Sequence, residues 1–316
     1  MARVDLIIPT YNGAAYLLAC LRSLSSSSFT DFNLIVFDDG SDQPVRREVH
    51  ELYPDAIIIR VEQNDGLTRA FNAAIGSSSA EYVVLLNNDT EVKKDWLAEL
   101  ASCADRHPDA GSVASKLRLA SDRSSLHSAG DTYSVRGMPG NRGVWLDDFG
   151  QYDIEGEIFS ACAGAALYRR AALEAVRLSN GDIFDTRLFM YCEDVDLGWR
   201  LQCAGYSCMF APKAIVYHHL SATGGGRLAS YYVARNVWLV LARSVPSPIR
   251  RRFWKRMAAY HLGRMFRTVR SMREPAARRS LAGTLHGVGA FVVSRDDSPD
   301  LAPEELDRIL DLLVDR

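Results

Sequence analysis

The 316-residue sequence lacks paired cysteines, a hydrophobic leader and any apolar run long enough to cross a membrane. Its six cysteines are scattered without a CxxC pair, which favours reduced, mostly buried thiols over disulfides or a zinc site. No run approaches the ~18 apolar residues that a membrane span needs. A strand-like run, Val4 to Ile8, begins almost at once, without the charged and apolar segments of a secretory signal. We therefore expect a cytoplasmic protein.

The sequence also lacks the glycine-rich phosphate loops of two large enzyme classes. Neither GxGxxG nor GxxxxGK follows the first strand-like run, which disfavours a dinucleotide oxidoreductase and a P-loop NTPase. What is present is an ordinary composition, 47% hydrophobic with net charge -2. Such a chain can bury a sizeable core and form one large domain with an appendage.

The near-zero net charge hides a strong asymmetry. From Arg227 to Arg279 there are 14 Lys and Arg against Glu274 alone, so this stretch carries +13 and the remainder -15. One interpretation is a solvated basic helix face. The other is a surface for anionic lipid headgroups, because residues 250–256 (RRRFWKR) mix cations with aromatics that favour the membrane interface. Nucleic acid is disfavoured, since no nucleic-acid module is recognisable and the rest of the chain is acidic.

Strand-like and helix-like segments alternate in the first 116 residues, which indicates βαβ units. The strand-like runs are continuously apolar, as in a mostly parallel, doubly wound sheet that helices cover on both faces. The predicted strands are Val4 to Ile8, Leu34 to Phe37, Ala56 to Val61, Tyr82 to Leu86 and Ser112 to Lys116. The predicted helices are Ala14 to Leu24, Val45 to Tyr53, Leu67 to Ile75 and Asp95 to Ala104.

Polar residues follow three of these strands, at the edge of the sheet where ligands bind in such folds. An Asp-Gly-Ser sequence alone is typical of a turn, but its place after a buried strand favours a binding site. Arg69 and Asn72, three residues apart in a further turn-helix element, share a face that could reach a diphosphate or sugar hydroxyls. The segments are Pro9-Thr10-Tyr11-Asn12-Gly13, Asp38-Asp39-Gly40-Ser41, Asn87-Asn88-Asp89 and Asn64-Asp65-Gly66.

A second acidic site, Glu193-Asp194, stands at a predicted helix start about 100 residues further on. If the helix continues to about Ala204, Asp194 shares its inward face with Leu197 and Leu201, whereas Asp196 points elsewhere. First-turn acids can also merely favour the helix dipole. Downstream, Ala214 to Tyr217 is a predicted strand that ends in two histidines, of which only one can face the crevice.

Taken in order, these segments resemble a family 2 glycosyltransferase of the GT-A fold. The resemblance covers about residues 3 to 225 and rests on an ordered set of motifs, and an ACAGAALYRRAAL segment makes the chain most similar to the rhamnosyltransferase-like branch. The motifs are PTYNG, DDGS, NDGLTRAFNAAI, NND, FDTRLFMYCEDVDLGWRLQCAGY and VYHH.

The resemblance implies that a nucleotide-diphospho-sugar donor, a dTDP- or UDP-sugar, lies across the first half of the sheet. Its DxD motif matches Asn87-Asn88-Asp89, where Asn replaces the first acid. A divalent metal, Mg²⁺ or Mn²⁺, would be held by Asp89 and His218 and would neutralise charge on the leaving diphosphate. The implied donor contacts are Pro9, Thr10, Tyr11, Asn12, Asp38, Asp39, Asn64, Gly66, Arg69, Asn72, Asn87 and Asn88.

The resemblance further implies that Asp194 is the general base, with Glu193 orienting the acceptor or supporting the base. Because adjacent carboxylates are coupled, the two roles could be exchanged. Gly164, Tyr191 and Trp199 are the implied acceptor contacts, although core packing suits Trp199 equally well. The stretch from Gly137 to Gly143 is predicted as a mobile loop over the acceptor mouth.

We therefore expect an inverting glycosyltransferase that moves a sugar, rhamnose being one candidate, to a glycan or lipid-linked glycan of the cell surface or cell wall. A nucleotide-sugar half (1–116), an acceptor half (117–226) and a basic helical region (227–316) are predicted. The basic region would hold the enzyme on the inner face of the plasma membrane, and a homo-oligomer is left open. Two alternatives remain: a sugar nucleotidyltransferase and a non-catalytic sugar-nucleotide-binding subunit.

Overall fold

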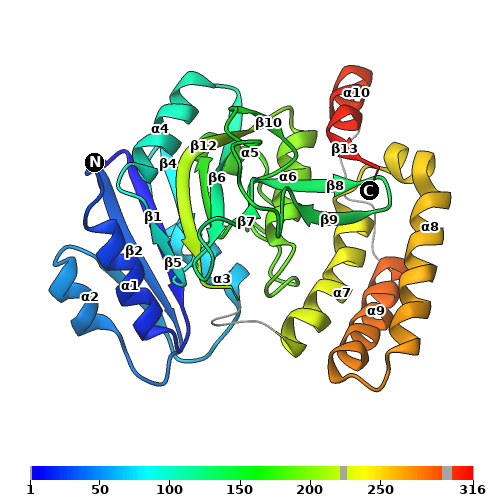
Figure 1. The fold of residues 1–316 in the computed structure, drawn as a ribbon, viewed down its shortest axis with the longest axis horizontal. Coiled ribbons are helices and arrows are strands. Elements are labelled where there is room, and N and C mark those ends of the chain that lie inside the picture. Colours follow the sequence, from blue (N-terminus) through cyan, green and yellow to red (C-terminus); the bar gives the residue numbers. More distant parts are fainter. Residues whose placement is uncertain (1, 221–225, 294–300, 316) are drawn as a thin grey trace.

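The computed structural model describes residues 2–220, 226–293 and 301–315. It has a central sheet with helices on both faces and a group of helices at one side (Figure 1). The strands are β1 (Val4–Thr10), β2 (Phe32–Asp39), β3 (Ile57–Val61), β4 (Tyr82–Leu86), β5 (Thr90–Val92), β6 (Ala110–Leu119), β7 (Leu126–Ser128), β8 (Asp131–Ser134), β9 (Met138–Asn141), β10 (Gly156–Ile158), β11 (Ala165–Arg169), β12 (Ser207–His218) and β13 (Leu313–Val314). The helices are α1 (Ala14–Leu24), α2 (Arg46–Leu52), α3 (Leu67–Gly76), α4 (Trp96–Arg106), α5 (Arg170–Ala175), α6 (Glu193–Cys203), α7 (Arg227–Arg243), α8 (Ser247–Arg270), α9 (Pro275–Val293) and α10 (Pro303–Leu312).

The large sheet has the order β10-β12-β6-β11-β4-β1-β2-β3. Its first half is parallel, because β1 pairs with β2 on one side and with β4 on the other, and β2 pairs with β3. In the second half β11 runs antiparallel between β4 and β6, while β6 and β12 are parallel. The carboxyl ends of β1, β2 and β4 thus meet where the strand order reverses, as expected for a doubly wound sheet.

The strands of this sheet are continuous apolar runs because helices cover both of its faces. One core packs α1, α2 and α4 on alternate residues of β1, such as Leu6 and Ile8. The other packs α3, α5 and α6 on the opposite face, through Ile7 of the same strand. Every strand and helix predicted above is present, with ends shifted by a few residues.

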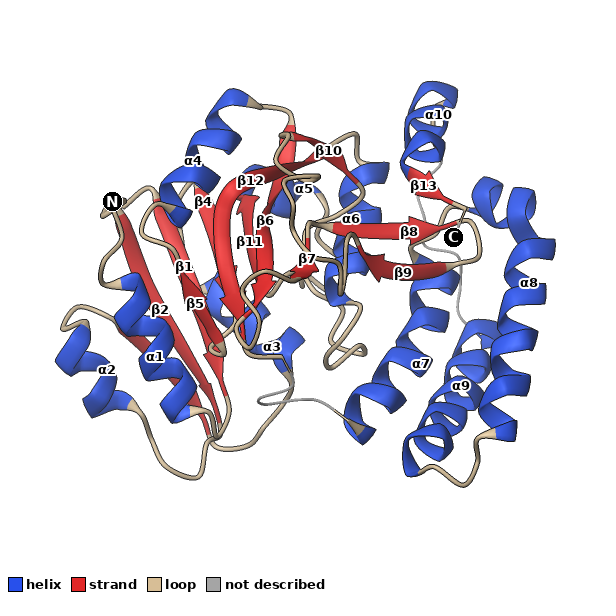
Figure 2. Cartoon of the chain, in the orientation of Figure 1, coloured by secondary structure: helices blue, strands red, loops and turns tan. Residues whose placement is uncertain are grey.

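The segment predicted as a loop from Gly137 to Gly143 is instead largely a strand, and that prediction was wrong. Met138–Asn141 forms β9, which pairs antiparallel with β8 in a small sheet beside the main one (Figure 2). Pro139 is tolerated because β9 is the edge strand of the order β13-β8-β9, where a missing N–H breaks no inner ladder.

The C-terminal region is built into the rest of the molecule rather than tethered to it. A third core joins Tyr133, Phe159 and Trp199 to Val237 and Leu241 of α7. Helix α9 lies against α7 at Gly283 and Gly287, where a Cβ would overlap the carbonyl oxygens of Tyr231 and Arg235. Strand β13 returns near the chain end to pair with β8. A domain boundary at residue 226 stays a prediction.

No helix in the described part of the chain is both long enough and apolar enough to cross a bilayer.

Candidate active site

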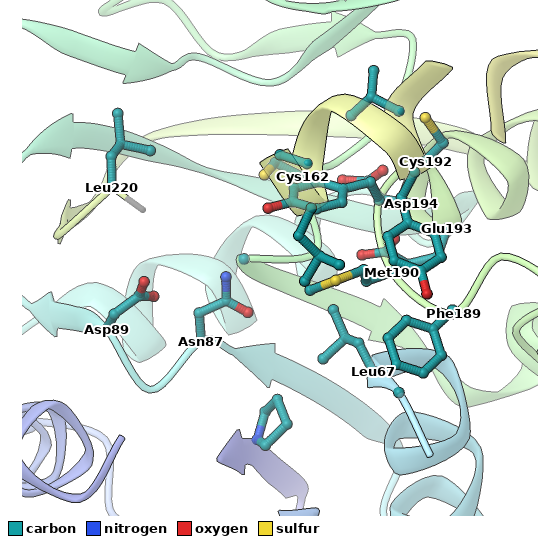
Figure 3. A pocket seen from close by; sticks show the side chains of 18 of the residues that line it. Leu67, Asn87, Asp89, Cys162, Phe189, Met190, Cys192, Glu193, Asp194 and Leu220 are labelled. Atoms are coloured by element: carbon teal, nitrogen blue, oxygen red, sulfur yellow. The ribbon is translucent and has the colours of Figure 1, made fainter. Parts of the chain in front are cut away.

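A cavity of about 730 Å³ opens where the carboxyl ends of β1, β2 and β4 meet the start of α6. Its volume lies in the range typical of sites for small organic ligands. In Figure 3, Asn87 and Asp89 lie on one wall, and Glu193 and Asp194 lie across from them. The two acidic sites that are far apart in the sequence therefore share one cavity.

Most of the predicted site residues line this cavity. From the donor half these are Pro9, Thr10, Tyr11, Asp39, Asn64, Gly66, Asn87, Asn88 and Asp89, and from the acceptor half Gly164, Tyr191, Glu193, Asp194 and His218.

Asp39, at the end of β2, holds the turn that leads into α3. Its two carboxylate oxygens accept hydrogen bonds from the backbone N–H groups of Asp65 (3.0 Å) and Gly66 (3.1 Å). Burial raises the pKa of Asp39, and these two hydrogen bonds oppose the shift. Gly66 has φ +92°, and any Cβ there would overlap the ring of Phe189. This glycine lets the donor wall touch the segment that precedes α6.

Asp38 and Asn12 do not line the cavity, and their prediction as donor contacts is corrected. Asp38 is 1% exposed; it accepts a hydrogen bond from Ser41 N and pairs with Arg60. The side-chain oxygen of Asn12 accepts from Asp42 N at 2.8 Å. Both residues therefore hold the turn after β2, which is the ordinary role of Asp and Asn in such a sequence.

Arg69 and Asn72 also lie outside the cavity, in a shallower depression on the other side of Asp39. The Asn72 amide is taken up in holding the loop before α6: it donates to Phe184 O and accepts from Ile183 N and Phe184 N. Their predicted place on one helix face is right, but that face is turned away from the cavity.

Trp199 is not an acceptor contact. It is 0% exposed and packs edge-on against Tyr133 and Phe159, with ring centroids 4.9 Å away in each case. It lies on the side of α6 that meets α7, so burial of its large apolar surface explains its presence.

On the donor wall, Asp89 and His218 are in contact. The Nε2 atom of His218 lies 3.1 Å from Oδ1 of Asp89, and its Nδ1 atom lies 3.0 Å from Nδ1 of His127. His219 instead pairs with Glu91 at 2.8 Å, so only one of the neighbouring histidines faces the cavity, as predicted. Burial, and next the neighbouring His218, lower the pKa of His127 to about 3, so its ring stays neutral.

The donor wall suits a divalent metal that a diphosphate helps to hold. Asp89 offers a carboxylate and His218 a ring nitrogen, and diphosphate oxygens or water would complete the coordination shell. Within the described ranges, one group of three close ligand residues occurs, Cys103, His107 and Glu155. It lies outside the cavity, and Arg106 already pairs with Glu155. The donor site is therefore the better candidate.

Asp194 and Glu193 sit at the start of α6 in different surroundings. The Asp194 carboxylate accepts backbone hydrogen bonds from Val195 N (2.8 Å) and Ala163 N (3.3 Å). Glu193 is 6% exposed, and its Oε2 atom has no hydrogen-bond partner among the described residues. Burial raises the pKa of both carboxyls, and the Asp194 charge helps to bring that of Glu193 to about 8. Glu193 therefore keeps its proton at neutral pH, whereas for Asp194 the two backbone hydrogen bonds oppose the upward shift of the pKa.

The segment before α6 is strained and is held from α7. Phe189, Tyr191 and Cys192 have φ between 65° and 67°, in the left-handed region that non-glycine residues rarely adopt. The side-chain amide of Asn236, which is 0% exposed, donates to the carbonyls of Leu188, Met190 and Tyr191. A buried amide in the C-terminal region therefore fixes the two carboxylates in place.

Glu193→Gln is expected to flatten the pH dependence of stability. In the folded protein this carboxyl keeps its proton up to about pH 8, whereas in the unfolded chain it loses it near the ordinary value of 4.5. The folded state binds more protons across that window, so this group's contribution to the free energy of unfolding is lost as the pH rises. Urea denaturation at several pH values, with the exposed Glu51→Gln as control, measures the difference. Equal pH dependence in the wild type and Glu193→Gln would contradict the assignment.

Several residues that line the cavity were not predicted from the sequence. Asp131 on β8 is 4% exposed and accepts hydrogen bonds from Ser160 (3.3 Å) and from Asn141 of β9 (3.4 Å). Burial, and next the Asp194 charge, raise its pKa well above the ordinary range. His127, Cys162 and Met190 also line the cavity. The predicted loop from Gly137 to Gly143 covered only β9 of this hairpin, and no element was predicted for β8, which carries this third carboxyl group.

Comparison with known proteins identifies the family. Residues 5–177 match the model of glycosyl transferase family 2. This match covers more than half of the chain, so the protein belongs to that family, as the motifs predicted.

Two relatives with named activities are similar over most of the chain. An N-acetylglucosaminyltransferase of Rhizobium meliloti is 29% identical over 227 residues, 67% of this chain and 50% of the relative. The N-acetylglucosaminyl-diphospho-decaprenol L-rhamnosyltransferase of Mycobacterium tuberculosis is 28% identical over 258 residues, 74% of this chain and 81% of the relative. The latter confirms the similarity to the rhamnosyltransferase-like branch. An uncharacterised protein of Sinorhizobium fredii is 29% identical, but the chain spans only 25% of its length.

Solved structures confirm the GT-A fold. Residues 1–349 of S. aureus TarS superpose with a TM-score of 0.59 at 18% identity, covering 98% of this chain and 83% of that one. The mannosyltransferase PcManGT of Pyrobaculum calidifontis, in complex with GDP-Man and Mn²⁺, gives a TM-score of 0.58 at 17% identity, covering 98% and 79%.

Proposed function

We propose that the protein is an inverting glycosyltransferase that moves a hexosyl group from a nucleotide-diphospho-sugar to a hydroxyl of a glycan. The observation that supports this best is the cavity shared by Asp89 and Asp194. A leaving diphosphate on the Asp89 wall and an acceptor hydroxyl beside Asp194 would place the anomeric carbon between them. An attack from the side opposite the leaving group inverts its configuration.

Asp194 is the general base in this proposal. Its two backbone hydrogen bonds favour the ionised form, which a base needs, and its side chain is partly exposed to the cavity. It takes the proton of the acceptor hydroxyl as that oxygen attacks. The nearby Asp196 is unsuited to this role, because it points to the other side of α6, where Arg200 and Ser244 hold it.

Glu193 orients the acceptor in this proposal. A carboxyl that keeps its proton at neutral pH can donate a hydrogen bond to an acceptor oxygen and adds no second negative charge beside the base. Gly164 and Tyr191 line the same cavity and complete the proposed acceptor contacts.

The nucleotide would lie along the ends of β1 and β2. The exposed ring of Tyr11, together with Pro9 and Thr10, offers a surface for the base, and Asn64 offers polar atoms for the ribose. The side-chain amide of Asn88 donates to Thr10 Oγ1 at 3.0 Å, which fixes its position beside β1. Asp89 and His218 would hold Mg²⁺ or Mn²⁺, which when bound neutralises charge on the diphosphate.

The proposed donor is a dTDP- or UDP-sugar, with rhamnose the first sugar to test, because of the similarity to the mycobacterial rhamnosyltransferase. That relative's name includes a lipid diphosphate acceptor, and we propose a lipid-linked or cell-surface glycan here too. The enzyme would then work on the inner face of the plasma membrane, where the +13 charge of residues 227–279 suits anionic headgroups.

Donor-dependent thermal stabilisation tests this function. A nucleotide sugar that binds the native form alone raises its apparent stability, by about 2.7 kcal/mol at a hundred times its Kd. We expect one member of a panel of dTDP-, UDP- and GDP-sugars, assayed with Mn²⁺, to raise the melting temperature more than the others. If no nucleotide sugar of the panel raises the melting temperature, the proposed donor site is wrong.

Product analysis then separates the two alternatives. Sugar transfer releases a nucleoside diphosphate, whereas a sugar nucleotidyltransferase releases pyrophosphate. A non-catalytic binding subunit would be stabilised by the donor but would neither transfer nor hydrolyse it.

A further inference from the structure

Helix α8 carries an exposed apolar stripe that the proposed reaction does not use. Along one side of the helix, Trp254 is 58% exposed, Leu262 61%, Phe266 61% and Val269 50%. With the exposed Ala258 they follow one another at three- or four-residue spacing, which places them on one face. We call Trp254, Ala258, Leu262, Phe266 and Val269 the α8 stripe. It is about 22 Å long at the usual helical rise.

Other residues of α8 pack into the protein, so the stripe is an outer surface of a folded helix. Ile249, Met257 and His261 are buried, and the centroid of the His261 ring lies 4.6 Å from that of Trp238 on α7. Figure 1 shows α8 along the outer edge of the molecule, with α7 and α9 on its inner side. Large apolar side chains in a row on an exposed helix mark an interaction site.

The charges around the stripe identify its partner as an anionic surface. Helix α8 contains no Asp or Glu, whereas Arg251, Arg252, Lys255, Arg267 and Arg270 are all exposed along it. Two of these cations border the stripe directly: Lys255 lies 5.8 Å from the Trp254 ring centroid, and Arg270 lies 5.4 Å from that of Phe266. Cations beside Trp, Phe and Leu are typical of helices that lie in the plane of a bilayer interface.

We propose that α8 docks the protein on an anionic bilayer by inserting the α8 stripe among the acyl chains while its cations contact the headgroups. This goes beyond attraction by the basic region, because buried apolar area supplies part of the binding. It rests on the proposed function only for its biological purpose, since vesicle binding needs neither donor nor acceptor. The insertion would hold the cavity at a fixed distance from lipid-linked acceptors, through α7, whose Leu228 and Tyr232 line the cavity.

The test is co-sedimentation of the full chain with two kinds of vesicle, phosphatidylcholine alone and phosphatidylcholine with about one-third phosphatidylglycerol. We expect the wild type to bind the anionic vesicles and to retain part of this binding in high salt. The variant Trp254→Ser/Leu262→Ser/Phe266→Ser should have a vesicle partition coefficient lower by about tenfold or more. Its circular dichroism spectrum and melting temperature should be unchanged.

The matched control is Ile57→Ser/Phe149→Ser/Ile154→Ser, which changes three exposed apolar side chains outside α8 and should bind as the wild type does. Equal binding of the stripe variant and the wild type would overturn the proposal, as would an equal loss in the control. Light scattering decides the remaining case: if the wild type forms oligomers that the stripe variant does not, and neither binds vesicles, the stripe is a contact between copies of this chain. Because donor-induced stabilisation is measured separately, a failure here leaves the proposed function standing.

Discussion

Asp194→Asn is expected to lower kcat by a factor of about 10² to 10⁴, the usual contribution of a positioned general base. Asparagine has nearly the same shape and can still accept a hydrogen bond from Ala163 N or Val195 N, but it cannot take a proton from the acceptor. The proposed donor site is on the opposite wall, so the Kd of the donor should change little. Steady-state kinetics together with calorimetric titration of the donor measures both quantities.

Glu193→Gln is the matched comparison for this variant. The side chains are adjacent and both line the cavity, but glutamine can replace a protonated Glu193 as a hydrogen-bond donor. We expect Glu193→Gln to retain much more activity than Asp194→Asn. If the order of the two variants is reversed, Glu193 is the base. If Asp194→Asn keeps more than about a tenth of the wild-type kcat, Asp194 is not the general base.

The sequence predicted the strands of the first 116 residues well because their signals are local. The strands Val4–Thr10 and Tyr82–Leu86 are uninterrupted apolar runs, and parallel strands bring their carboxyl ends to one edge whatever the rest of the chain does. Asp89 and His218, which are in contact, could be selected in the same way, because both are polar residues at the ends of apolar strands. Order along the chain was sufficient for this part of the site.

Residues whose roles depend on distant partners were predicted less well. Asn72 looks like a ligand contact from its place on α3, but it is occupied by the backbone of Phe184, 112 residues away. From the sequence, Trp199 could equally well stack on a sugar or fill a core. It fills a core because α7 packs beside it. Asn236 and Asp131 gave no signal at all, because one acts through the carbonyls of a segment 45 residues earlier and the other depends on an unpredicted hairpin.

These distant contacts also explain why the acceptor side and the C-terminal region form one unit. Strand β13 pairs with β8, which carries Asp131, and Asn236 of α7 holds the backbone that leads into Glu193. A carboxylate that acts as a base must be held in a fixed position, and here the helices after residue 226 supply part of the support. Helix α8, which we propose to meet the membrane, is therefore packed on the same framework as Glu193 and Asp194.

Asp89→Ala is expected to weaken metal-dependent donor binding by about tenfold or more. The substitution removes the carboxylate that the NND segment contributes to the cavity. His218→Ala should show a loss of the same kind, since the two side chains are in contact. The matched control is His219→Ala, whose ring pairs with Glu91 and lies beside Tyr16 outside the cavity.

Calorimetric titration of a nucleoside diphosphate, with Mn²⁺ and with a chelator, measures the effect without any need for the acceptor. In the wild type the chelator should reduce affinity, and in Asp89→Ala the two conditions should give nearly equal Kd values, because the metal then has too few protein ligands to bridge the diphosphate. A wild-type affinity that is the same with Mn²⁺ and with chelator would show that donor binding needs no metal here. In that case the Asn in place of the first acid of the DxD motif has a direct explanation: a second carboxylate is of use only where a cation neutralises it, and without one it would repel the diphosphate.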